Sequence, residues 1–189
     1  MTTVFSIRKA AGILDAGGVI AYPTEGVYGI GCRPDNLEAV NRILTIKGRK
    51  AGAGLILIAP DADMFANWIA PSNIEASRLA SKTTGPVSWI VTAAAHVDPI
   101  LTGGRKTLAV RLVSHSVVSE LCYATGSPLV STSANRSGHR AAKTSFQARC
   151  WLGNELDYVI SGPLGGASGP SEIRVAQSNQ VIRPGSAPK

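Results

Sequence analysis

The sequence predicts a mixed α/β (α+β) fold in a single domain spanning residues 1–189, with a twisted mixed sheet flanked by helices. Three observations support this class. A chain of 189 residues is the usual size of one domain with its own core. Hydrophobic residues make up 44% and charged residues 16%, a balance that disfavours disorder. Short apolar runs typical of strands alternate with helical patterns along the chain.

Helices are expected where apolar residues recur at helical spacing behind a capping residue. Ser6 is positioned to cap the first helix, which runs to Gly17-Gly18, and Asp35 the second, which ends at Lys47. Ser114-His115 opens a further helix. The expected helical ranges are 6–17, 35–47, 61–69, 72–82, 116–126 and 144–153.

Strands are expected at the short apolar runs between these helices, most of them rich in Val, Ile and Leu. The run at 18–22 stops at Pro23, and the glycine-rich piece after it is read as a loop. The Gly/Ser/Pro-rich piece 161–171 is expected to be a mobile loop, and residues 185–189 a frayed tail. The remaining expected strands are 54–59, 86–93, 107–113, 127–135, 157–162, 171–176 and 180–184.

The chain is basic, with 19 Lys and Arg against 12 Asp and Glu, a net charge of +7 and a pI near 9.7. Such a charge favours an anionic partner, such as a nucleotide, a phosphate or a nucleic acid. The alternative is that the basic composition has no specific functional reason. The basic residues gather at 42–50, 105–111 and 136–149, which could converge in space.

Cysteines and histidines give no metal or disulfide pattern. The three cysteines are far apart and lack a Cys-x-x-Cys pair, and no histidine stands at ligand spacing from them. No apolar run reaches the ~18–20 residues of a membrane span, and the N-terminus lacks a leader pattern. A cytoplasmic protein without membrane contact is therefore expected.

Thr24-Glu25 follows the first strand directly and precedes closely spaced glycines at 26, 29 and 31. Glycines after a strand let backbone N–H groups approach an anion. The spacing is neither that of a P-loop nor that of the dinucleotide fingerprint. A tight turn that needs positive φ explains the glycines equally well.

Two cationic groups have unusual positions. Lys47-Gly48-Arg49-Lys50 closes a helix, where it either complements the helix dipole or holds a polyphosphate. Arg111 lies within an apolar strand, which is costly unless an anion pairs with it. That anion is either an internal carboxylate or, as we favour, the carboxylate of a ligand.

Hydroxyl and amide groups concentrate in "LVSTSANRSG", residues 129–138, at the end of a strand. Such donors and acceptors suit the ribose and phosphate oxygens of a nucleotide, although a Ser-rich turn has the same composition. No catalytic Ser-His-Asp or Cys-His set and no paired carboxylates stand out. Basic and hydroxyl groups without a general base are typical of nucleotidyl or phosphoryl transfer, where positioning and charge neutralisation dominate.

Taken in order, these segments resemble the YrdC-like family of threonylcarbamoyl-AMP synthases, in its short bacterial single-domain form. The resemblance rests on Pro-Thr-Glu with "VYGIGC", Lys-Gly-Arg, "GLILIA", "GPVSWIV", "LAVRLVSH", "PLVSTSAN" and "GPSEIR", and it runs from about residue 4 to about residue 184. It implies a twisted sheet with a basic concave face.

The family activity implied is a nucleotidyltransferase reaction that uses L-threonine, bicarbonate or CO2, and ATP. It yields threonylcarbamoyl-adenylate and pyrophosphate, with Mg2+ carried by ATP rather than by protein side chains. Separate proteins then transfer the threonylcarbamoyl group to the tRNA adenosine beside the anticodon. Direct tRNA contact through the basic face is also implied.

The resemblance also assigns roles to particular residues. It places Lys47 and Arg49 in the catalytic role at the ATP phosphates, and it adds Ser133, Asn135 and Arg183 to the ATP site.

The threonine site implied by the resemblance consists of Thr24, Arg111, Ser131 and Ser171. Glu25 either buttresses its loop or attracts the substrate ammonium group, and the sequence does not choose between the two.

The chain departs from the family pattern at three places. Gly26 stands where the family usually has Thr, Gly52-Ala53 replaces an Asp-Lys pair, and Thr83-Thr84 replaces Trp-Pro before Gly-Pro. Two other functions compete with the family activity. One is an RNA-binding module without turnover, which would bind double-stranded RNA or tRNA through phosphate contacts. The other is a carbamoyltransferase or hydrolase acting on another small amine.

Overall fold

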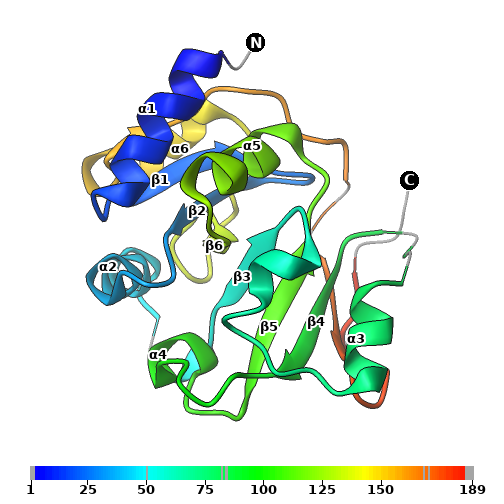
Figure 1. The fold of residues 1–189 in the computed structure, drawn as a ribbon. Helices are drawn as coiled ribbons and strands as arrows, with labels where there is room; N and C mark the ends of the chain where they lie inside the picture. Colours follow the sequence, from blue (N-terminus) through cyan, green and yellow to red (C-terminus); the bar gives the residue numbers. More distant parts are fainter. Residues whose placement is uncertain are drawn as a thin grey trace.

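The computed structural model describes residues 3–49, 51–81, 83, 85–167, 169 and 171–185. Lys50, Thr84, two residues of the 161–171 piece and the tail 186–189 lie outside the described residues, so the expectations placed on them have no structural counterpart here. The described chain folds around one mixed sheet of nine strands, in the order β7-β1-β2-β6-β3-β5-β4-β8-β9 (Figure 1). The predicted fold class is confirmed.

The elements follow the predicted alternation. The strands are β1 (Ile20–Pro23), β2 (Tyr28–Cys32), β3 (Ile56–Ala59), β4 (Val87–Thr92), β5 (Thr107–Leu112), β6 (Leu129–Ser133), β7 (Tyr158–Val159), β8 (Glu172–Val175) and β9 (Val181–Arg183). The α-helices are α1 (Val4–Asp15), α2 (Leu37–Lys47), α3 (Asn73–Leu79), α4 (Pro99–Thr102), α5 (Ser116–Thr125) and α6 (Ser145–Leu152). Short 3-10 turns are η1 (Ala51–Ala53), η2 (Ala62–Phe65) and η3 (Gly153–Glu155).

Several predicted boundaries were wrong. Helix α1 is capped by Thr3 rather than Ser6, and α2 by Asn36 rather than Asp35. Thr3 lies three residues before Ser6, so α1 begins earlier than predicted. Asn36 lies one residue after Asp35 and directly precedes Leu37, the first residue of α2. The predicted helix over 61–69 is only the turn η2, and the helix predicted at 72–82 ends at Leu79.

The glycine-rich piece after Pro23 contains a strand, β2, and not only the predicted loop. It pairs antiparallel with β1 on one side and with β6 on the other. Glycine is a poor strand former by itself, so this pairing outweighs local propensity. Close approach explains Gly31, because a Cβ there would collide with the Val130 carbonyl and the Tyr22 hydroxyl.

Two apolar layers cover the two faces of the sheet. On one face, Leu57, Val110 and Val130 belong to the core cluster that includes the buried stripes of α2 and α6. On the other, Ile58 and Leu129 join the buried residues of α1 and α5, which pack together at the top of the molecule in Figure 1. Side chains alternate along a strand, and paired residues share a face.

This alternation places the polar residues of several strands on the second face. Ser131 pairs with Gly31 and Ile56, Ser133 pairs with Gly29, and Arg111 pairs with Ile58. They therefore share the face of Ile58. Among the described residues, no helix is both long and apolar enough to cross a membrane.

Candidate active site

Lys47 is the centre of a buried polar cluster at the end of α2. Its Nζ donates to the backbone oxygen of Ser133 at 2.6 Å, to the Ser133 hydroxyl at 3.3 Å and to Oδ1 of Asn135 at 2.5 Å. The lysine is only 3% exposed. Sequence reasoning placed these three residues in one site, and the structure brings them into contact.

Asn135 is held rigidly within this cluster. Its Nδ2 donates to the carbonyl of His139 at 2.5 Å, and its Oδ1 also accepts from the Ser133 hydroxyl at 2.6 Å. The carbonyl of Lys47 in turn accepts from the Ser137 amide at 2.9 Å. The loop after β6 and the end of α2 are therefore joined through side chains and backbone together.

Burial, together with the smaller effect of the nearby positive charge of Arg49, lowers the pKa of Lys47 to about 8. Its three partners are uncharged oxygens, so no anion compensates the ammonium group. A desolvated ammonium group without an anionic partner favours its neutral form. The arrangement would accept a negatively charged ligand, whose charge would restore the ordinary pKa of Lys47.

Arg49 influences both Lys47 and a second cation, Arg183. Burial lowers the pKa of Arg183, and the positive charges of Arg49 and Arg111 add to the effect. The segment after α2 and strand β5 thus place positive charge near Arg183 of β9. Like charges brought together repel, and an anionic ligand relieves that repulsion.

Ser171 is buried at the β8 side of the sheet, where its hydroxyl lies 2.9 Å from that of Ser88. The guanidinium of Arg183 donates to the carbonyl of Ser171 at 2.8 Å. The sequence assigned roles to Ser171 and Arg183 but none to Ser88, although Ser88 lies within the segment "GPVSWIV" that supports the family resemblance. Its partner comes from 83 residues further along the chain, a contact that local patterns cannot reveal.

Arg111 has an internal carboxylate partner. Its Nη2 lies 3.5 Å from Oε2 of Glu25, and both side chains are about 15% exposed. Of the two partners left open for this arginine, the structure contains the internal carboxylate. Oε1 of Glu25 also accepts from the Ser114 amide at 3.3 Å. Glu25 therefore buttresses its loop against the segment that enters α5.

Thr24 lies directly after β1 and is 6% exposed. Its hydroxyl donates to the carbonyl of Val27 at 2.7 Å, within the turn that joins β1 to β2. Ser131, also buried, lies on the neighbouring face of β6 and close to the position of Gly29. Thr24 and Ser131 therefore both lie beside Gly29.

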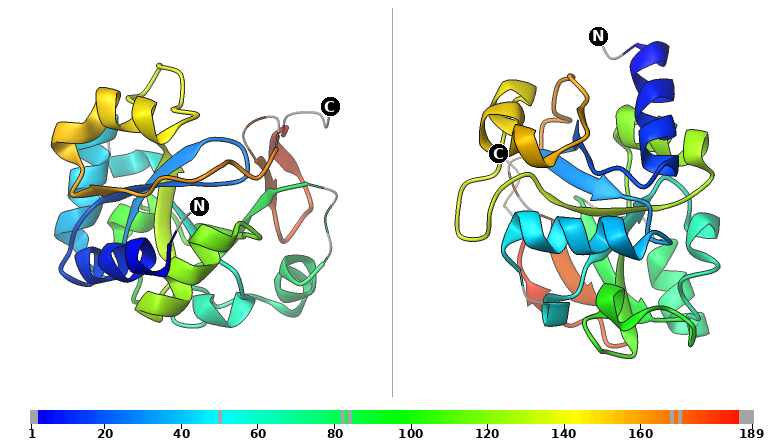
Figure 2. Two further views of the ribbon diagram at one scale, coloured as in Figure 1. Left: turned by 90° about the horizontal axis from the view of Figure 1, so that it is seen from above. Right: turned by 90° about the vertical axis from the view of Figure 1, so that its left-hand side faces the viewer.

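The segment 161–167 crosses over the Thr24 turn. Gly165 donates to the carbonyl of Thr24 at 3.1 Å, and Ala167 donates to that of Glu25 at 2.8 Å. Figure 2 shows this orange segment running along the blue β1–β2 hairpin. A Cβ at Gly26 would lie 2.8 Å from the Gly169 carbonyl and 3.2 Å from that of Ala167. The absence of a side chain at Gly26 allows this close approach.

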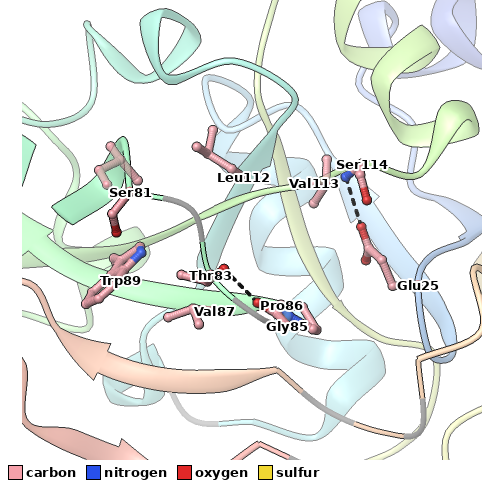
Figure 3. Close-up of a pocket in the computed structure, with 11 residues that line it drawn as sticks. Glu25, Ser81, Thr83, Gly85, Pro86, Val87, Trp89, Leu112, Val113 and Ser114 are labelled. Carbon is pink, nitrogen blue, oxygen red and sulfur yellow. Dashed lines mark hydrogen bonds between the residues drawn. The ribbon is translucent and has the colours of Figure 1, made fainter. Parts of the chain in front are cut away.

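A cavity of about 360 Å³ adjoins Glu25. Figure 3 shows Glu25 and Ser114 at one end of its lining and Trp89 and Ser81 towards the other. Leu112 and Val87 contribute apolar walls. None of the site residues expected from the sequence, Thr24 included, is among the residues that line this cavity. Glu25 lines the cavity and also forms the ion pair with Arg111.

Four buried polar side-chain atoms in the described part of the chain have no hydrogen-bond partner. They are the Tyr22 hydroxyl, Oε2 of Glu25, Nε of Arg111 and Nδ1 of His115. Burial raises the pKa of the Tyr22 hydroxyl, so it remains protonated. Sequence reasoning missed Tyr22 and His115, because both occur in segments that read as ordinary core or capping residues.

Metal-binding side chains do not cluster in the described residues: no group of three or more His, Cys, Asp or Glu could hold an ion. The site is instead a set of cations, hydroxyls and one carboxylate on a mixed sheet. The protein is of the mixed α/β class, and such a set of side chains is suited to an anionic ligand.

Comparison with known proteins identifies the family. The profile of the Sua5/YciO/YrdC family, described as "Telomere recombination", matches residues 12–185. The chain belongs to this family. It is 46% identical over 178 residues to a threonylcarbamoyl-AMP synthase of Nitrosococcus oceani, covering 94% of this chain and 96% of the relative. It is 43% identical over 183 residues to one of Halorhodospira halophila, covering 96% of each.

Solved structures agree with this assignment. Sua5 of P. abyssi complexed with L-threonine superposes with a TM-score of 0.88 at 28% identity, covering 96% of this chain and 54% of Sua5. The chain thus spans about half the length of Sua5. YciO of E. coli superposes with a TM-score of 0.81 at 26% identity, covering 95% of this chain and 88% of YciO.

Proposed function

We propose that this chain is a threonylcarbamoyl-AMP synthase, which converts L-threonine, bicarbonate or CO2, and ATP into threonylcarbamoyl-adenylate and pyrophosphate. Relatives with that name match it over nearly their whole length. The observation that carries the proposal is the contact of Lys47 with Ser133 and Asn135 beside further cations. Such a cluster suits a triphosphate and the adenylate made from it.

The ATP site in this proposal consists of Lys47, Arg49, Ser133, Asn135 and Arg183. Lys47 supplies a point charge, and Arg49 supplies a planar fork for phosphate oxygens. A phosphate entering this region would replace the uncharged acceptors that now surround the Lys47 ammonium group. Lys47 and Arg49 act as the catalytic pair because they would neutralise charge that develops on the departing pyrophosphate.

The threonine site consists of Thr24, Arg111, Ser131 and Ser171. Arg111 would bind the α-carboxylate, because a guanidinium matches a carboxylate with two parallel hydrogen bonds. Buried hydroxyls of Ser131 and Ser171 can both donate and accept, which suits the hydroxyl and carbamate oxygens of the substrate. P. abyssi Sua5, a structural neighbour, has been solved with L-threonine, which supports an amino-acid site on this fold.

The reaction proceeds in two steps. The neutral amine of threonine adds to the carbon of CO2 and loses one proton, which gives a carbamate. From bicarbonate the same bond forms with loss of one water. A carbamate oxygen then attacks the α-phosphorus of ATP, the bond to the β-phosphate bridging oxygen breaks, and pyrophosphate leaves. Mg2+ carried by ATP would neutralise charge on these phosphates, beside Lys47 and Arg49.

Water must be kept from the adenylate, which hydrolyses readily. The segment 161–167, which is hydrogen-bonded over Thr24 and Glu25, would limit access of water to the site. In a cytoplasmic setting the product would pass to separate transfer proteins that modify tRNA. The net charge of +7 would assist a direct contact with tRNA.

The decisive experiment mixes the protein with ATP, Mg2+, bicarbonate and threonine, omits each in turn, and follows pyrophosphate release. Release that requires both threonine and bicarbonate supports the proposal. Replacement of threonine by serine or alanine, or of bicarbonate by carbamoyl phosphate, tests the carbamoyltransferase alternative. Salt-dependent tRNA binding without any turnover would instead favour an RNA-binding module.

A further inference from the structure

The pair formed by Glu25 and Arg111 is neutral in charge but incomplete in hydrogen bonding. Their nearest charged atoms are 3.5 Å apart, whereas a charge-assisted hydrogen bond measures about 2.7–2.9 Å. Oε2 of Glu25 and Nε of Arg111 are both buried without a hydrogen-bond partner. Buried polar atoms are normally paired, so two unpaired atoms of opposite character at one place need an explanation.

Glu25 does not depend on Arg111 for its position. The Ser114 amide donates to its Oε1, and Ala167 donates to its backbone carbonyl. The backbone of Thr24, its neighbour, is held by Gly165 in the same way. Glu25 is therefore held from the segment entering α5 and from 161–167, and its Oε2, 3.5 Å from Arg111, still lacks a hydrogen-bond donor.

Space for a ligand exists beside this carboxylate. Glu25 lines the cavity of about 360 Å³, and Figure 3 shows it at one end of the lining residues, next to Ser114. The other charged residues assigned to the site are Lys47, Arg49, Arg111 and Arg183, all cations that would repel an ammonium group. Glu25 is the anionic member of the set.

We propose that Glu25 determines specificity by binding the α-ammonium group of the incoming amino acid, before that group loses its proton and reacts, while Arg111 binds its α-carboxylate. The inference rests on the proposed function, which makes threonine the ligand. A zwitterion inserted between the two side chains gives Oε2 a donor and Nε an acceptor at once. A ligand with a carboxylate but no ammonium group competes with Glu25 for Arg111 and leaves Oε2 unpaired. Glu25 therefore selects amino acids over hydroxy acids and simple anions.

The test compares L-threonine with 2,3-dihydroxybutanoate of matching configuration, in which a hydroxyl replaces the ammonium group. Affinities are measured by calorimetry at a saturating concentration of a nonhydrolysable ATP analogue with Mg2+. The variant Glu25→Gln keeps an oxygen for the Ser114 amide but removes the charge. Glu120→Gln, which alters an exposed carboxylate on α5, is the matched control.

The wild type is expected to prefer threonine by about tenfold or more, the effect of one charge-assisted hydrogen bond. Glu25→Gln should weaken threonine about tenfold without weakening the hydroxy acid, so the preference nearly disappears, while Glu120→Gln behaves like the wild type. Equal weakening of both ligands, or an unchanged preference, overturns the inference.

Two further outcomes separate this inference from the proposed function. A wild type that binds threonine but does not prefer it over the hydroxy acid overturns the role of Glu25 even if Glu25→Gln fails to fold. A wild type that binds the ATP analogue but not threonine overturns the proposed function, and the inference with it.

Discussion

The Nζ atom of Lys47 lies 2.5 Å from Oδ1 of Asn135, although the two residues are 88 positions apart in the chain. This contact joins the end of α2 to the loop after β6. It places a desolvated lysine beside an amide whose other end is fixed by His139. The two motifs that the sequence marked as separate clusters therefore form one site.

Removal of either cation at the phosphate site should impair catalysis. Lys47→Ala or Arg49→Ala is expected to lower threonine-dependent ATP–pyrophosphate exchange at least about tenfold, because each group would supply roughly 2–4 kcal/mol to the charged transition state. Lys9→Ala removes an exposed cation from α1 and should leave exchange near wild type. Unchanged exchange in both site variants would reject the assignment.

Replacement of Arg111 by lysine should affect one substrate far more than the other. Lysine keeps the positive charge but loses the planar fork that binds a carboxylate through two hydrogen bonds. The KM for threonine is expected to rise about tenfold, with the KM for ATP within about twofold of wild type. Steady-state kinetics with each substrate varied in turn measures this, and equal increases in both constants would contradict it.

The pKa of Lys47, about 8, predicts a pH dependence of ATP binding. Only the ammonium form of Lys47 binds phosphate. Above pH 8 the free protein must therefore take up a proton when ATP binds, and the affinity for ATP falls by at most about tenfold for each unit of rising pH. Phosphate groups complete their own titration near pH 6, below this range.

Calorimetry between pH 7 and 9.5 in buffers of different ionisation enthalpy measures both the affinity and the proton uptake. Lys47→Arg stays charged throughout and should show a flat profile with no proton uptake. Identical slopes for the wild type and Lys47→Arg would show that Lys47 is not the titrating group.

A side chain at position 26 should displace the segment that crosses the Thr24 turn. Gly26→Thr introduces a Cβ that would lie 2.8 Å from the Gly169 carbonyl, so the hydrogen bonds from Gly165 and Ala167 should weaken. Each contributes about 0.5–1.5 kcal/mol, so amide exchange at these residues should accelerate at least about fivefold.

Hydrogen exchange detected by mass spectrometry measures this change. Gly12→Ala in α1 is the control, because a Cβ there meets no atom within 4 Å. Its exchange over residues 161–167 should match the wild type. Unaltered exchange in Gly26→Thr would mean that the segment accommodates the new side chain without leaving the turn.

Local patterns predicted the fold class and most elements, because apolar runs and helical spacing depend on neighbouring residues. They failed at β2, where Gly29 and Gly31 weaken the strand signal and pairing with β1 and β6 restores it. The roles assigned to individual site residues remain predictions that the experiments above test.

Contacts between distant segments could not be predicted in the same way. No role was assigned to Ser88 from the sequence, and its contact with Ser171 depends on the register of β4 against β8. The partner of Arg111 was left open between a ligand and an internal carboxylate, because choosing Glu25 requires knowing where the β1–β2 turn folds. Such contacts depend on how the strands are ordered and paired in the sheet, which local sequence patterns do not specify.

The place of β6 between β2 and β3 has a consequence for synthesis on the ribosome. Until the nascent chain has emerged past Ser133, the β1–β2 hairpin and the β3–β5–β4 ribbon are two separate pieces, each with an open edge that can pair with other chains. Insertion of β6 covers the two edges that face each other, on β2 and β3, and delivers Ser131 and Ser133 in the same event. The outer edges of β1 and β4 are covered only when β7 and β8 emerge, so Ser171 and Arg183 complete the proposed site in the last part of synthesis.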